Sequence, residues 1–211
     1  MFHNAEGEGQ VSDLLHAFAE SCNTAFIGLA TKNLTPSDFP ATAAMYRLGQ
    51  VPQMGLAGYA GSVPTPSDEA DLAATSIGQG RVLVSPLNLA MVAAAADTGT
   101  VHAPRLVTGA PDDTAATKQL SANVVTDLHQ MMAQVVATGT AAGQGLPAGT
   151  YAKTGTAEYG TTNPLKIDAW LIGFRGNLAF AVLVVNAPGD GGPTDGPIAA
   201  KFLDALGSQA G

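Results

Sequence analysis

Residues 151–158 read YAKTGTAE, and the chain is organised around this stretch. Lys153 supplies a point charge for an anionic group. If the segment is extended, Thr154 and Thr156 point to one face, because side chains alternate with a period of two. Gly155 between them allows a ligand to lie against the backbone. A strand edge of this kind suits a substrate carboxylate and a developing oxyanion, although an ordinary exposed strand with polar residues fits the same pattern.

The last third of the chain is predicted to form three strands and a closing helix. The strands are expected at residues 150–158, 167–174 and 178–186. Gly176-Asn177 suits a tight hairpin between the last two. The run FAVLVV is nearly all apolar, so we expect the third strand to be covered on both faces. Asp195 is expected to cap the final helix, at residues 197–206. The predicted apolar stripe of this helix comprises Ile198, Phe202, Leu203 and Leu206.

The region before residue 150 is predicted to be mainly helical. Helices are expected at residues 11–19, 24–31, 39–48, 69–76, 87–97 and 122–137. Residues 101–107 have extended character, whereas residues 1–10, 50–68 and 111–117 are expected to be loops. Ser21 and Asn23 lie at a helix–helix junction, where capping is the simplest explanation for short polar side chains. This order of elements, with helices first, then a strand meander and a closing helix, predicts an α+β fold. The helical part would span about residues 1–149, and the strand meander and closing helix about residues 150–211.

The composition is that of an acidic globular chain. Of 211 residues, 46% are hydrophobic and 12% are charged, which suffices for one domain with a core. The net charge of -8 argues against nucleic acid as a partner. The histidines lack metal-ligand spacing, and Gly78 with Gly80 lacks the third glycine of a dinucleotide fingerprint. We therefore predict no metal and no cofactor. No apolar run is long enough to span a bilayer.

Two short motifs and their flanking residues resemble the penicillin-binding protein transpeptidase family. The motifs are S-x-N, as Ser21-Cys22-Asn23, and K-T-G, as Lys153-Thr154-Gly155. The segments AESCNTAF, SIGQGRVLVSPLNLAMVAAA, YAKTGTAE and DAWLIGF are similar to family segments in the same order. The resemblance implies the penicillin-binding, serine β-lactamase-like transpeptidase fold. It also implies a D,D-transpeptidase that cross-links peptidoglycan stem peptides through a serine acyl-enzyme and binds β-lactams.

The same resemblance implies a role for each motif residue. Ser21 would relay a proton to the leaving amine with the help of Lys153, and Asn23 would hold the substrate amide. Thr154 and Thr156 would bind the terminal carboxylate, and the backbone N–H of Thr156 would form half of the oxyanion hole. The substrate-binding residues would thus be Asn23, Thr154, Gly155 and Thr156.

One departure from the family pattern concerns the nucleophile. The family's serine lies in an S-x-x-K motif before S-x-N, and none of the five lysines here has a serine three residues before it. We therefore expect a partial domain that is inert alone. Its unpaired sheet edge and apolar patch should favour self-association or pairing with the missing N-terminal half. The enzyme would act at the extracytoplasmic face of the bacterial plasma membrane, anchored by a segment outside this sequence. Asp168 stands where family members often have histidine.

Two other functions remain open from the sequence. A non-enzymatic descendant of the fold would recognise peptidoglycan, a β-lactam-like ligand or a partner protein, and would fold stably by itself. A β-lactamase has weaker support, because the serine class that shares K-T-G-T does not usually carry S-x-N. The missing nucleophile motif counts against that function as well.

Overall fold

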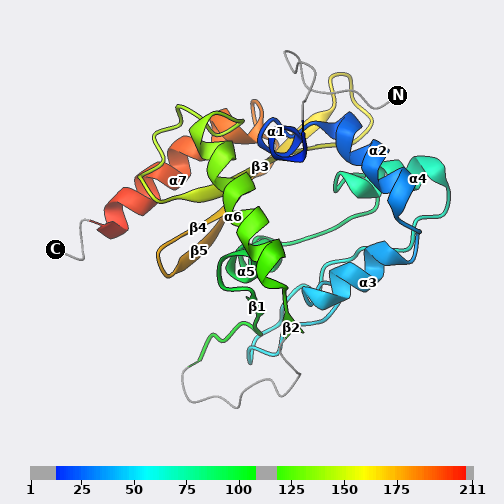
Figure 1. Ribbon diagram of the computed structural model, residues 1–211, viewed down its shortest axis with the longest axis horizontal. Coiled ribbons are helices and arrows are strands. Elements are labelled where there is room, and N and C mark those ends of the chain that lie inside the picture. Colours follow the sequence, from blue (N-terminus) through cyan, green and yellow to red (C-terminus); the bar gives the residue numbers. More distant parts are fainter. Residues whose placement is uncertain (1–12, 108–117, 208–211) are drawn as a thin grey trace.

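The computed structural model describes residues 13–107 and 118–207, and Figure 1 shows their arrangement. The structure combines helices with a three-stranded antiparallel sheet, so the predicted α+β class is confirmed. The expected loops at residues 1–10 and 111–117 lie outside the described residues, as do the first residues of the helix expected at 11–19.

Among the described residues, six helices precede the three-stranded sheet. They are α1 (Leu14–Ala19), α2 (Asn23–Asn33), α3 (Asp38–Met45), α4 (Glu69–Ser76), α5 (Pro86–Thr98) and α6 (Ala122–Ala137). Their ends follow from local capping. Ser85 and Asn88 form a capping box at the start of α5, and Gly99 ends that helix with a left-handed φ of 72°. The α1 helix begins later than predicted, because the Asp13 carboxylate accepts the N–H of His16 at 2.8 Å and caps it there.

The sheet consists of β3 (Tyr151–Tyr159), β4 (Lys166–Arg175) and β5 (Leu178–Val184), in that order. Gly176 has a φ of 59° in the tight turn between β4 and β5, which agrees with the predicted hairpin. A separate two-stranded ribbon pairs β1 (Thr100–Val101) with β2 (Lys118–Gln119). Of the stretch predicted to be extended, residues 101–107, only Val101 belongs to a strand, and β2 was not predicted.

The two faces of the sheet pack against different helices (Figure 1). Leu171 lies on the face covered by α7 (Gly191–Gly207), where it packs with Leu203. Phe174 lies on the opposite face and packs with Met132 of α6 and Ala96 of α5. Both α5 and α7 contact β5, in agreement with the coverage expected for the run FAVLVV.

The α7 helix differs from the prediction at its start and in its buried face. It begins at Gly191, so Asp195 lies inside the helix and is not its cap. Ala199 and Leu203 face the sheet and are at most 1% exposed, since residues four apart share one side of a helix. The preceding positions are rotated away from the sheet. Of the predicted stripe, only Leu203 is therefore buried, and the exposed members are Ile198 at 47%, Phe202 at 47% and Leu206 at 40%.

Asp195 is a buried acid on the sheet-facing side of α7. It is 0% exposed, and neither carboxylate oxygen has a hydrogen-bond partner among the described residues. Burial disfavours the charged form and raises the pKa of this carboxyl to about 6. A side chain in this environment is better accommodated when it is protonated.

We predict that Asp195→Asn stabilises the protein at pH 8 more than at pH 5. The folded state holds the Asp195 proton more tightly than the unfolded chain does. Its stability should therefore fall as pH rises from the ordinary pKa of 3.8 through about 6. The amide cannot ionise, so its advantage should grow by about 1 kcal/mol between the two pH values.

Differential scanning calorimetry at both pH values measures this difference. The matched control is Asp204→Asn, because Asp204 is an exposed acid on the same helix. An equal effect of Asp195→Asn at pH 5 and pH 8 would contradict the raised pKa.

Candidate functional site

The junction between α1 and α2 places Ser21 in an unusual backbone conformation. Ser21 has a φ of 57°, a left-handed value that residues other than glycine rarely adopt. The N–H of Cys22 donates to the carbonyl of Ala17 at 2.8 Å, and the Cys22 side chain is 2% exposed. Cys22 is the N-cap of α2, and Asn23 is the first helical residue. The interpretation of Ser21 and Asn23 as caps was therefore wrong.

Lys153 of β3 meets Ser21 although 132 residues separate them in the sequence. Its Nζ donates to the Ser21 hydroxyl oxygen at 2.8 Å and to the carbonyl of Thr154 at 2.8 Å. The same Nζ lies 5.6 Å from the ring centroid of Phe18 in α1, within the range of a cation–π contact. The ammonium thus lies beside a hydroxyl that can pass on a proton, and it can stabilise negative charge there.

The two threonines of the motif face α7. Thr154 is 8% exposed, and its hydroxyl pairs with the hydroxyl of Thr140. The Thr156 hydroxyl accepts the N–H of Gly191 at 3.3 Å. As predicted, Thr154 and Thr156 share one face of the strand, whereas Lys153 lies on the other. Their role in binding a carboxylate stays a prediction.

Thr140 connects the end of α1 to the K-T-G strand, and sequence reasoning missed it. Its N–H donates to the carbonyl of Ala19 at the end of α1, at 3.1 Å, while its hydroxyl contacts Thr154 of β3. The preceding residue must be small, because a Cβ at Gly139 would lie 2.3 Å from the Ala19 carbonyl oxygen. The only signal in the sequence is the Thr-Gly-Thr run at residues 138–140.

Glycines allow close packing around the K-T-G strand. A Cβ at Gly155 would lie 3.3 Å from the Cβ of Trp170, its partner on β4. A Cβ at Gly191 would lie 2.3 Å from the Gly155 carbonyl oxygen and 2.5 Å from that of Trp170. The start of α7 can therefore touch the backbone of both strands only because residue 191 has no side chain.

Asp168 is the third residue of β4, opposite Ala157 of β3. Its carboxylate accepts the N–H of Asn186 at 3.0 Å, and Asn186 has a left-handed φ of 53°. This acid therefore holds the turn that follows β5.

In residues 13–107 and 118–207, no group of three acidic, histidine or cysteine side chains could hold a metal ion. In the same ranges, no helix is long and apolar enough to cross a membrane.

Comparison with known proteins identifies the family. The model of the penicillin binding protein transpeptidase domain matches residues 2–204. The chain belongs to this transpeptidase family. It is 34% identical to the peptidoglycan D,D-transpeptidase PbpA of Mycolicibacterium smegmatis, over 93% of this chain and 43% of that protein. It is 35% identical to PbpA of Mycobacterium tuberculosis, over 95% of this chain and 44% of that protein. This chain thus spans less than half the length of these curated relatives.

Solved transpeptidase structures confirm the predicted fold. The ceftriaxone acyl-enzyme complex of penicillin-binding protein A from M. tuberculosis matches with a TM-score of 0.83 and 29% identity. That match covers 97% of this chain and 51% of the solved chain. The complex of PBP2 with MreC from Helicobacter pylori matches with a TM-score of 0.81 at 22% identity, over 98% of this chain and 43% of that one. The second match supports the fold alone.

We predict that Gly191→Ala destabilises the protein, because the added methyl group collides with two strand carbonyls. Overpacking of this kind typically costs about 1–3 kcal/mol in the free energy of unfolding. The control is Gly28→Ala in α2, where a Cβ meets nothing within 4 Å and no left-handed φ is required. That change should stabilise the helix by roughly 0.5–1 kcal/mol. Urea unfolding of both variants measures the two effects, and equal stabilities would contradict the close contact at Gly191.

Proposed function

We propose that this chain is part of a peptidoglycan D,D-transpeptidase that works through a serine acyl-enzyme. The observation that carries the proposal is the 2.8 Å contact between Lys153 Nζ and Ser21 Oγ, which joins the S-x-N and K-T-G motifs. Membership of the family and the similarity to PbpA support the same reaction. Because no S-x-x-K motif occurs in the sequence, the nucleophilic serine would come from residues outside it.

The proposed chemistry needs a proton to reach a leaving amine. The nucleophilic serine attacks the carbonyl of a D-Ala-D-Ala bond, an ester forms, and the C–N bond breaks. The leaving nitrogen must then be protonated. Ser21 would donate its hydroxyl proton to that nitrogen and would be reprotonated from Lys153, which already donates to the Ser21 oxygen. The proton released by the attacking serine would return to the lysine.

Substrate binding would use the open side of β3. In the described part of the chain β3 pairs with β4 alone, so its other edge can approach an extended peptide. Asn23 would hold the substrate amide, and Thr154, Gly155 and Thr156 would bind the carboxylate end. The N–H of Thr156 would contribute to the oxyanion hole. A β-lactam would occupy the same place and acylate the same serine.

The whole sequence would then be one partial transpeptidase domain. Residues 1–149 would form its helical part, and residues 150–211 would form the strand meander and closing helix. We propose that the enzyme acts at the extracytoplasmic face of the bacterial plasma membrane, where peptidoglycan is cross-linked. A segment outside the given sequence would anchor it. The alternative is a non-enzymatic descendant that binds such ligands reversibly, and the missing S-x-x-K motif favours it.

Intact mass after incubation with benzylpenicillin tests the proposal. The measurement compares this chain with one extended through the upstream coding sequence. We expect a covalent adduct on the extended chain alone. An adduct on this chain would identify another serine, such as Ser21, as the nucleophile. No adduct on either chain would reject the acyl-enzyme and favour the binding descendant.

On the extended chain, Lys153→Ala should slow acylation by a factor of 100 or more. General acid–base groups contribute about 10²–10⁴-fold, and this change removes the donor to Ser21. The matched control is Lys201→Ala on α7, where the lysine is exposed. Stopped-flow acylation measures both rates. A loss of less than threefold at Lys153 would argue against its role in the proton relay.

A second proposal concerns the exposed stripe on α7. Ile198, Phe202 and Leu206 are 40–47% exposed along one side of the helix, and in the described residues β5 pairs with β4 alone. Such surfaces favour association. We propose that the missing N-terminal half of the domain covers them, and that copies of this chain associate when that half is absent.

Light scattering at high concentration should therefore give a mass above the 21.2 kDa of one chain. Phe202→Glu should lower this mass toward that of a monomer. Leu56→Glu should not, although Leu56 is 64% exposed, because it lies in the loop between α3 and α4 and not on α7. A monomer at high concentration for the unaltered chain would contradict the proposed surface.

A further inference from the structure

A side chain in the connection between α4 and α5, that of Gln79, is hydrogen-bonded to the K-T-G strand. The side-chain amide nitrogen of Gln79 donates to the carbonyl oxygen of Thr156 at 3.0 Å. The two residues are 77 positions apart, and the bond is partly buried. It directly joins the turn after α4 to the strand that carries Lys153 and Thr156.

The glycines on either side give Gln79 a defined position. Gly78 and Gly80 both have left-handed φ values, 74° and 71°. The N–H of Gln79 donates to the carbonyl of Ala74 at 2.9 Å and so closes the end of α4. A Cβ at Gly80 would lie 3.1 Å from the Cβ of Ala74. The Gly-Gln-Gly sequence thus forms a tight turn with the glutamine at its tip, which explains two glycines that match no nucleotide-binding motif.

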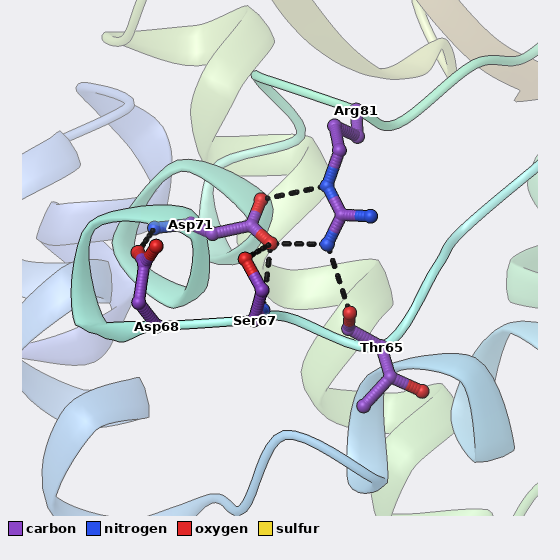
Figure 2. A network of polar contacts seen from close by, with 5 residues as sticks. All are labelled: Thr65, Ser67, Asp68, Asp71 and Arg81. Atoms are coloured by element: carbon purple, nitrogen blue, oxygen red, sulfur yellow. Dashed lines mark hydrogen bonds and ion pairs between the residues drawn. The ribbon is translucent and has the colours of Figure 1, made fainter.

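An ion pair holds the residue after this turn, as Figure 2 shows. The Arg81 guanidinium donates twice to the Asp71 carboxylate and once to the Thr65 carbonyl at 2.9 Å. Asp71 also accepts the N–H of Ser67 at 2.8 Å. The hydrogen bond from Arg81 lowers the pKa of Asp71 to about 2, so the pair stays charged at neutral pH. Gln79 therefore projects from a turn that is fixed to α4 and to the long loop before it.

The bond from Gln79 constrains the reactive edge of β3. The N–H and C=O groups of one strand residue point to the same side. Since Gln79 reaches the Thr156 carbonyl from outside the sheet, the N–H of Thr156 also faces the open edge. We propose that Gln79 is a positioning residue, which holds the Thr156 backbone so that this N–H is presented to the developing oxyanion. The inference rests on the proposed acyl transfer.

Two near-isosteric substitutions on the extended chain test this role. Gln79→Met removes the donor, and Gln79→Glu replaces it with a group that repels the carbonyl at neutral pH. We expect benzylpenicillin acylation to slow about tenfold for Gln79→Met, in line with the loss of one hydrogen bond, and further for Gln79→Glu. The matched control is Gln53→Glu. The Gln53 amide donates to the Val51 carbonyl at 3.3 Å, so its hydrogen bond lies within its own loop and does not involve β3.

A pH profile separates positioning from general destabilisation. A protonated carboxyl can donate again, so Gln79→Glu should regain part of its rate relative to the unaltered protein near pH 5. Gln79→Met should not recover. The inference would be overturned if both variants were acylated at the unaltered rate. It would also be overturned if the rate fell in proportion to a lowered melting temperature and did not recover at low pH.

A readout independent of activity keeps the two proposals distinguishable. In this chain, Gln79→Met should shift the Thr156 carbonyl carbon resonance and leave that of distant strand residues unchanged, whereas Gln53→Met should shift neither. If the extended unaltered chain is not acylated, the proposed function fails while a shift at Thr156 still supports the Gln79 contact. An unchanged Thr156 resonance would overturn the inference in either case.

Discussion

The contact between Lys153 and Ser21 depends on a specific arrangement of distant parts of the chain. The ammonium reaches the hydroxyl only if the α1–α2 junction lies beside the first residues of β3. Thr140 secures that approach, because its backbone binds the end of α1 and its hydroxyl binds Thr154. The absence of a side chain at Gly139 lets the two backbones come together. A left-handed Ser21 is the local cost of presenting the hydroxyl, and backbone strain of this kind is common at functional sites.

The two faces of β3 serve different purposes. Lys153 points toward α1 and the candidate site, whereas Thr154 and Thr156 point toward α7 and its glycine-rich start. Close packing at Gly191 holds the start of α7 against β3 and β4, so the position of the K-T-G residues also depends on this helix. Asp195 on the same helix is a buried acid with no hydrogen-bond partner in the described part of the chain. The same helix that packs against the K-T-G strand therefore also carries a group whose burial is unfavourable in its charged form.

Family membership and the geometry of the site agree, but they establish different properties of the protein. The family match and the similarity to penicillin-binding protein A establish the fold and the relationship. The geometry shows which side chains are in contact. These contacts include the bond from Gln79 to Thr156 and the bond between Thr140 and Thr154, which no short motif describes. Because the chain spans less than half of its curated relatives, activity remains a property of the proposed larger protein.

The sequence by itself determined the local structure. Capping residues and apolar periodicity located α4, α5 and α6 closely, and the Gly176 turn located the hairpin, because these features arise from interactions within a few residues. The alternation of Lys153 with the threonines was equally readable. Tertiary structure decided the rest. The meeting of Lys153 with Ser21, the reach of Gln79 to Thr156 and the burial of Asp195 depend on how separate elements pack. The face that α7 turns to the sheet was mispredicted for the same reason, since helical periodicity identifies possible faces and only packing selects one.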